Sequence, residues 1–374
     1  MLKDSQTKKP ITSSKTTTTK TTTTTNKATG KITTKTTTKT TISQKKEELS
    51  VKADSRKSYG PFKFKIPIDS EIIEALKLKD VPDKVQKMIL QNKEEDYNSI
   101  PTPIEGDWLW TNEEYYQTFD LYNDLEAMRN IPNKYKNVIY LKNMDEGMEG
   151  SLITDDVLNK LIQIVSLYYP QGVKLDILKT KDNFETLKVK FRTNDFTLQK
   201  QYNGCEALGA LIPLRPHDGF MVLGITSFDI YNKEEQNFVF GLASAFDSTG
   251  CFSINRFYLD HSFTFKDPAE IMINSIKSAA GTMIHEVGHI FGIKHCVYYN
   301  CKMNGTNSIE ESQRVPVFDF CPVCIRKLWN TLEFDIKDRV LQLSKGLKEI
   351  YGKSVDVSKE TAWFVKRYNS IKDI

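Results

Sequence analysis

Three of the five histidines in this 374-residue chain lie within one short apolar segment, GTMIHEVGHIFGIKHC, residues 281–296. His285 and His289 are four residues apart, so in a helix they share one face and can bind one metal ion. Glu286 is next to the first ligand but rotated away from the metal, where a general base for an activated water belongs. Gly292 can adopt the left-handed conformation that ends a helix, which lets the chain turn and bring His295 back as a third ligand.

Three nitrogen ligands leave the fourth position of a tetrahedral zinc open, which is the condition for catalysis rather than for a structural role. The shorter H-E-x-x-H match also arises by chance on helices whose histidines are merely packed. The additional glycine and third histidine at the required offsets favour a catalytic zinc site. The two remaining histidines, His217 and His261, are expected to be ordinary, although His217 precedes a strand and could approach the cleft.

Four cysteines follow the third histidine, and their spacing predicts a second metal site. Cys296 and Cys301 form one pair, Met303 follows, and Cys321 and Cys324 form the second pair. Two such pairs in a reducing compartment are typical of a closed four-thiolate zinc site, which has a structural role. Free thiols or a disulfide are the alternatives. A zinc at this place would clamp the loop that carries the third histidine.

The cysteines outside this set, Cys205 and Cys251, have apolar sequence neighbours, so both are predicted to be small buried residues.

The charge of the chain is unevenly distributed. Residues 1–57 contain 14 Lys/Arg and 4 Asp/Glu, whereas the rest contains 38 Lys/Arg and 44 Asp/Glu. The basic character therefore belongs to the N-terminal segment, and the body gives no reason to expect nucleic-acid binding. Residues 1–58 are rich in threonine and lysine and poor in apolar residues, which predicts a disordered tail. The chain shows neither a secretory signal nor an apolar stretch long enough to span a membrane, so we expect a cytoplasmic or nuclear protein, monomeric by default.

The remaining sequence predicts an α/β (α+β) fold, a twisted mixed sheet covered by helices. Residues 59–135 form a lead-in expected to pack on a catalytic domain that spans 136–374 and ends in helices. Strand-like runs occur at 137–141, 172–178, 220–226, 237–243 and 251–259. Helical patterns occur at 154–169, 198–211, 267–291, 325–351 and 358–371.

The combined motif resembles that of one family. His285, Glu286, His289, Gly292 and His295 match the metzincin signature H-E-x-x-H-x-x-G-x-x-H, and the continuation C-x4-C-x-M-x17-C-x-x-C is similar to that of the archaemetzincins (archaelysins). The resemblance covers 138–329 and, more loosely, 59–135, and it is to the eukaryotic type.

The resemblance implies a metzincin-like fold with a five-stranded mixed sheet, an active-site helix and a methionine turn at Met303 beneath the zinc. The strand near 237–243 would be the antiparallel edge strand that binds an extended peptide. Two zinc ions per chain are expected, together with peptidase activity. Eukaryotic members are regarded as aminopeptidases on short peptides, and Glu310 or Glu311 could anchor the substrate amine or could be solvated charges. The alternatives are an inactive zinc scaffold that binds peptides or a partner protein, and a nucleic-acid binder that uses the cysteine site and the basic tail.

Overall fold

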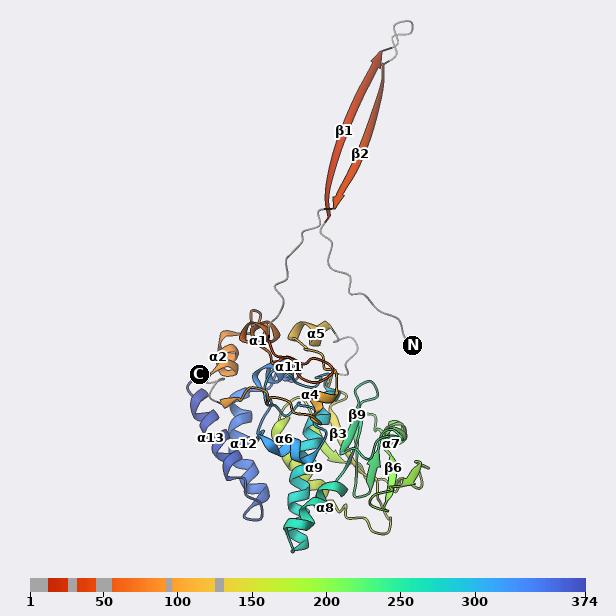
Figure 1. Cartoon of the computed structure of the whole chain (residues 1–374), viewed down its shortest axis with the longest axis vertical. Coiled ribbons are helices and arrows are strands. Elements are labelled where there is room, and N and C mark those ends of the chain that lie inside the picture. The colour runs from red at the N-terminus through yellow and green to blue at the C-terminus, as the bar shows by residue number, and fades with distance from the viewer. Residues whose placement is uncertain (1–12, 26–31, 45–55, 92–95, 125–130) are drawn as a thin grey trace. The chain divides into compact units, whose positions relative to one another are not determined.

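A five-stranded sheet forms the centre of the unit Arg56–Ile374, in the order β4-β3-β7-β10-β9 (Figure 1). Neighbouring strands run parallel from β4 to β10, and β9 runs antiparallel to β10 at the edge. The predicted mixed sheet is therefore confirmed, and so is its antiparallel edge strand. The strands are β3 (Val138–Asn143), β4 (Lys174–Ile177), β7 (Gly219–Thr226), β9 (Gly241–Ser244) and β10 (Thr249–Ser253). The computed structural model describes residues 13–25, 32–44, 56–91, 96–124 and 131–374.

The central strand β7 is buried at all eight positions, as expected for a parallel strand covered on both faces. Alternate side chains of this strand enter different cores, because successive residues point to opposite faces of a sheet. Met221 and Leu223 join the larger core, which also contains side chains from the long helices. Val222 joins the smaller core together with Cys251 of β10.

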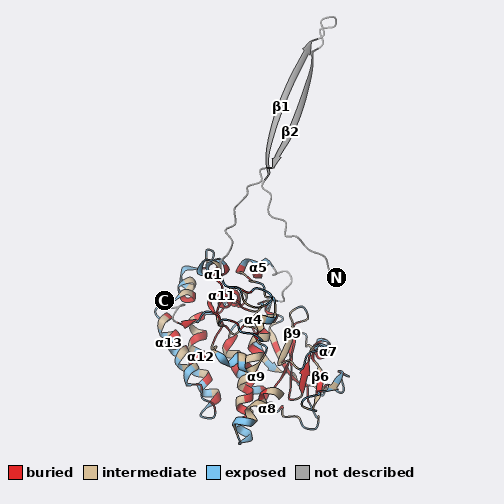
Figure 2. Cartoon of the chain, in the orientation of Figure 1, coloured by how far each residue is buried: buried red, intermediate tan, exposed pale blue. Residues whose placement is uncertain are grey.

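Helices α6 (Asp155–Tyr168) and α9 (Pro268–Ile290) supply the larger core, and α12 (Ile336–Tyr351) packs on α6. Helix α13 (Ser358–Ile371) in turn packs on α12, and both show a buried and an exposed side (Figure 2). On the other side of the sheet lie α7 (Gly204–Leu211), the 3₁₀ turn η2 (Ile212–Leu214) and a small sheet of β5 (Phe191–Thr193), β6 (Lys200–Asn203) and β8 (Asp229–Tyr231).

The described residues of the lead-in form four short helices, and their apolar side chains belong to the same core as the central sheet. Helices α1, α2 and α5 contact α11, the helix that begins directly after Cys321. Residues 59–135 and the sheet that follows them therefore share one compact unit. The bounds are α1 (Asp69–Leu76), α2 (Asp83–Leu90), α4 (Trp108–Thr111), α5 (Phe119–Asp124), α10 (Ile309–Arg314) and α11 (Pro322–Leu332).

Three predictions of helices and strands are wrong in part. Residues 251–259 were expected to be one strand, but β10 ends at Ser253 and α8 (Asn255–Thr264) follows, because the Ser253 hydroxyl accepts a hydrogen bond from the backbone N–H of Asn255. Residues 325–351 form two helices instead of one, since Glu333 adopts the left-handed conformation (φ 51°).

The predicted helix 198–211 has a strand, β6, in its first half. The prediction failed because residues 200–203 form the central strand of the small sheet, and Tyr202 enters the smaller core. Cys205 is exposed instead of buried, whereas Cys251 is buried as expected.

In the unit Met1–Ser55, the described residues are two strands, β1 (Ser13–Thr25) and β2 (Ile32–Gln44), which pair antiparallel. This pairing lies within the segment 1–58, for which the sequence predicts disorder. Threonine has a high strand propensity, so the composition is compatible with a hairpin. The prediction for 1–12, 26–31 and 45–55 lies outside the described residues. No helix within the described residues is long and apolar enough to cross a membrane.

Candidate metal centre

The three histidines are presented by the end of α9 and the loop after it. The helix starts where Asp267 caps it, with its carboxylate accepting a hydrogen bond from the N–H of Ala269 and Pro268 at the first position. Its buried side includes Ile276, Ala280, Met283, Ile284 and Val287, at spacings of three and four residues. The predicted helix 267–291 is thus confirmed, and it holds His285 and His289 on one face.

The helix ends in a Schellman motif centred on Gly292, which has φ 88°. The N–H of Ile293 donates to the carbonyl of Gly288 at 3.1 Å, and the N–H of Gly292 donates to that of His289 at 2.8 Å. Glycine adopts the left-handed conformation more readily than other residues, so the conformation of Gly292 agrees with its predicted role. The turn directs the following residues back toward the helix and brings His295 to the other two histidines.

The imidazoles of His285, His289 and His295 form one cluster. One ring nitrogen from each lies within 4.8 Å of the others, and Nε2 of His285 and Nε2 of His289 are 2.9 Å apart. Tetrahedral zinc with bonds of about 2.0–2.1 Å separates its nitrogen ligands by about 3.3 Å. The cluster therefore has the donor type and nearly the dimensions that a zinc ion requires.

The opposite nitrogen of each ring is fixed by an oxygen atom. Nδ1 of His285 donates to the carbonyl of Lys302 (2.7 Å), and Nδ1 of His289 donates to that of Ile293 (2.6 Å). Nδ1 of His295 donates to the Glu114 carboxylate (2.5 Å). These acceptors place the proton on Nδ1 and leave Nε2 free to bind a metal.

Burial and the neighbouring rings lower the pKa values of His285 and His289. Burial, with a further contribution from His295, lowers the pKa of His285 to about 4. Burial, and then the two other histidines, also holds the pKa of His289 well below its usual value. Neutral imidazole is the form that binds a metal.

Glu286 lies on α9 beside the cluster and lines the same cleft. Within the described part of the chain, its carboxyl group has no hydrogen-bond partner, and burial raises its pKa to about 8. A nearby divalent cation would favour the charged form. An unpaired carboxyl group beside three metal-ligand atoms is suited to exchange protons with a water molecule or substrate.

Met303, which the resemblance predicts to form a methionine turn, is fully buried. A Cβ atom built on Gly288 would lie 2.4 Å from Sδ of Met303, so the helix and the thioether can approach this closely only because residue 288 is glycine. The carbonyl of Met303 accepts a hydrogen bond from the N–H of Cys296 at 2.7 Å. The methionine turn is thereby tied to the loop that carries His295.

The four predicted cysteine ligands also meet. Sγ atoms of Cys296, Cys301, Cys321 and Cys324 lie within 4.8 Å of one another, and all four side chains are buried. Sγ of Cys296 is 3.5 Å from Sγ of Cys321, close to the separation of about 3.8 Å in a tetrahedral site with zinc–sulfur bonds of about 2.3 Å. The four thiols therefore fit a closed four-thiolate site, and one of them, Cys296, directly follows His295 in the chain.

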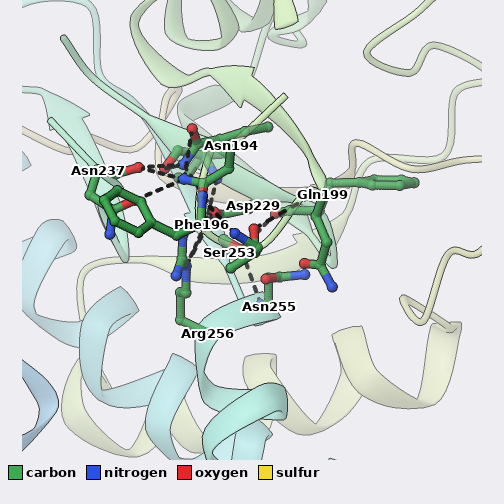
Figure 3. Close-up of polar contacts among 12 residues, drawn as sticks. Asn194, Phe196, Gln199, Asp229, Asn237, Ser253, Asn255 and Arg256 are labelled. Carbon is green, nitrogen blue, oxygen red and sulfur yellow. Dashed lines mark hydrogen bonds and ion pairs between the residues drawn. The ribbon is translucent and has the colours of Figure 1, made fainter. Parts of the chain in front are cut away.

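A cleft of about 980 Å³ contains the histidine cluster and extends along the edge strand β9. The segment before β9 is anchored by the small sheet. The carbonyl of Asn237 accepts hydrogen bonds from the side chains of Gln201 (2.7 Å) and Asn194 (3.1 Å). Asp229, which also accepts from Gln201, forms a buried ion pair with Arg256 of α8 (Figure 3).

The remaining candidate residues from the sequence differ in whether they line the cleft. His217 is exposed and does not line the cleft, whereas His261 lines it and contacts the Ser278 hydroxyl. Glu310 is exposed, but Glu311 lines the cleft and accepts hydrogen bonds from the backbone N–H groups of Trp108 (2.9 Å) and Asn307 (2.7 Å).

Sequence reasoning missed Glu114, whose carboxylate contacts His295 from the lead-in. Burial disfavours its charged form, but the hydrogen bonds from His295 and from Nε1 of Trp108 outweigh this effect and lower its pKa. No spacing rule connects residues 181 positions apart, so the sequence offers no signal for this contact.

The chain is similar to several known proteins. The model of peptidase family M54 matches residues 152–330. Archaemetzincin-2 of Mus musculus is 28% identical over 274 residues, which are 68% of this chain and 75% of the mouse protein. The archaemetzincin of Thermococcus kodakarensis is 33% identical over 189 residues, which are 46% of this chain and 98% of the archaeal protein. The crystal structure of archaemetzincin from Methanopyrus kandleri is 24% identical with a TM-score of 0.39, and it covers 54% of this chain and 99% of that one.

The histidine cluster, the mixed sheet and the matched residues define a zinc metallopeptidase class. Within it, the chain belongs to the archaemetzincins, peptidase family M54. The similarity to mammalian archaemetzincin-2 agrees with the eukaryotic type that the sequence motif indicates.

Proposed function

We propose that this protein hydrolyses peptide bonds with one zinc ion held by His285, His289 and His295. The proposal rests on the convergence of three ring nitrogens, with the opposite nitrogen of each ring hydrogen-bonded to an oxygen. Beside them lies Glu286, whose carboxyl group has no hydrogen-bond partner among the described residues. When bound, Zn²⁺ would act as a Lewis acid for a water molecule and for the scissile carbonyl.

The residues of the chain would perform the remaining steps. An extended peptide would pair with the free edge of β9, which borders the cleft. Glu286 would accept a proton from the attacking water at its carboxylate and then deliver it to the departing amine nitrogen. The second zinc would be held by Cys296, Cys301, Cys321 and Cys324 and would stabilise the loop that precedes and includes this set.

We also propose that the substrates are short peptides with a free amino terminus. Support comes from the resemblance to eukaryotic family members, and Glu311 is the candidate amine anchor, since of the two acidic residues it is the one that lines the cleft. Peptides that differ only by N-acetylation test this part. We expect the acetylated peptide to be cleaved at least tenfold more slowly, and equal rates would refute the exopeptidase preference while leaving the hydrolase proposal intact.

The chemistry is tested with the variant Glu286→Gln in the zinc-loaded full-length protein. We expect it to keep its zinc and to lose peptide hydrolysis by orders of magnitude, because the amide cannot take up the proton. The matched control is Glu310→Gln, an exposed carboxylate outside the cleft, which should retain the wild-type rate. Wild-type protein that is fully loaded with zinc and cleaves none of a broad peptide library would indicate an inactive scaffold instead.

A further inference from the structure

The lead-in lies against the loop that carries the third histidine and contacts nearly every residue of it. The hydroxyl of Tyr122 donates to the carbonyl of Phe291 at 3.1 Å. The Gln117 side chain donates to the carbonyl of Gly292 (3.0 Å) and accepts from the N–H of Lys294 (2.9 Å). The Glu114 carboxylate accepts a hydrogen bond from Nδ1–H of His295.

The three lead-in side chains that make these contacts are shielded from solvent. Tyr122 and Gln117 are buried, with exposures of 0% and 4%, and the Glu114 side chain is 12% exposed. Hydrogen bonds in such surroundings contribute more than exposed ones, because water does not compete for the same groups. The contacts are therefore suited to fix the conformation of the loop.

The third histidine needs this support more than the other two. His285 and His289 are part of α9, whose backbone sets their direction, whereas His295 follows the helix end. Among the described residues, the Glu114 carboxylate is also the only charged group that accepts a hydrogen bond from a ring nitrogen of the cluster, since His285 and His289 donate to backbone carbonyls. The indole of Trp108 donates to the same carboxylate oxygen at 2.6 Å and packs edge-on against the His295 ring at 4.8 Å between centroids.

We propose that the lead-in is part of the metal centre, with Glu114 as a positioning residue that orients His295 and increases its affinity for the zinc ion. Carboxylate partners of metal-binding histidines fix the tautomer and make the ligand nitrogen more basic. The inference rests on the proposed zinc site. It adds a residue that lies outside the family-model match, which begins at residue 152.

The segment that presents Glu114 is itself anchored to the far side of the cleft. Asp107 forms a two-bond ion pair with Arg314, at 2.7 Å for each bond, and Glu311 accepts the backbone N–H of Trp108. The lead-in thus connects the His295 loop with the segment after the methionine turn. A change of the Glu114 side chain alone removes the contact to His295 and leaves these anchors in place.

The test is the affinity of the full-length protein for zinc at the three-histidine site, measured by competition with a chelator of known affinity. We expect Glu114→Ala to weaken binding by about 10–100-fold, the typical effect of losing such a partner. Glu114→Gln, which keeps an oxygen acceptor but loses the charge, should lie between alanine and wild type. The matched control is Glu113→Gln, which changes the exposed carboxylate next to Glu114 in the chain, and it should bind zinc within twofold of wild type.

Two further measurements distinguish the positioning of His295 from a general loss of structure. Zinc at the four-cysteine site should stay bound in every variant. Cobalt substituted at the three-histidine site should show an altered visible spectrum in Glu114→Gln but not in Glu113→Gln. Unchanged zinc affinity in Glu114→Ala would overturn this inference alone. Wild-type protein that binds no zinc at the three histidines would overturn the proposed function as well.

Discussion

Replacing Gly288 with alanine tests how closely the active-site helix rests on the methionine turn. The added Cβ would lie 2.4 Å from Sδ and 3.0 Å from Cε of Met303, whose side chain is fully buried. Overpacking of a filled core costs about 1–3 kcal/mol. The gain in helix propensity from glycine to alanine is about 0.5–1 kcal/mol and opposes this cost. We therefore expect a net loss of up to about 2.5 kcal/mol in the free energy of unfolding.

The same helix provides a matched control at Gly281, where an added Cβ would meet no atom within 4 Å. Gly281→Ala should stabilise the protein by about 0.5–1 kcal/mol. The propensity contribution is the same in both variants, so their difference isolates the collision with Met303 at about 1–3 kcal/mol. Urea unfolding at one fixed zinc concentration measures both, since bound zinc itself adds to apparent stability.

The double variant Gly288→Ala/Met303→Ala completes the test. Removing the thioether makes room for the new methyl group, so the cost of Gly288→Ala should largely disappear in this background. Equal stabilisation by Gly288→Ala and Gly281→Ala would refute the close contact between the helix and the methionine turn.

Two further changes test the second metal site and the anchor of the lead-in. Cys324→Ser should reduce the zinc content from two ions to one and lower the unfolding temperature, because metal binding is coupled to folding. Its control is Cys205→Ser at an exposed thiol outside the cluster, and retention of both ions by Cys324→Ser would contradict the four-thiolate site. Asp107→Asn should lower the free energy of unfolding by about 1 kcal/mol at pH 7. Burial opposes ionisation of Asp107, but its hydrogen bonds with Arg314 and the N–H of Ile104 outweigh burial and hold its pKa below the usual 3.8. The ion pair therefore contributes fully above about pH 4 and loses its effect only as the pH falls through the lowered pKa. A difference between wild type and Asp107→Asn that already disappears between pH 7 and pH 5 would contradict this assignment.

The parts of the site that could be predicted from sequence are those set by local geometry. The helical spacing of His285 and His289, the glycine that ends the helix and the paired cysteines each follow from short-range rules. The predicted helices 154–169 and 267–291 likewise begin at Thr154 and Asp267, whose side chains accept backbone hydrogen bonds at the starts of α6 and α9. These features are encoded within a few residues of one another.

The parts that were missed depend on contacts between distant segments. Glu114 and Gln117 reach the His295 loop across more than 170 residues, and nothing in their neighbourhood distinguishes them from solvated polar side chains. The aromatic run of α8 resembles a strand in sequence, but its Phe257 stacks on Phe240 next to the edge strand. Tertiary contacts decided the first outcome, and at α8 the stacking of Phe257 acts together with the local hydrogen bond between Ser253 and Asn255.

The most direct test of the account is anomalous diffraction at the zinc edge from crystals of the zinc-loaded full-length protein. The account predicts two peaks, one among the ring nitrogens of His285, His289 and His295 with Glu286 beside it, and one among the four cysteine sulfurs. Crystals that show the three imidazoles well ordered, with no peak among them, would contradict it.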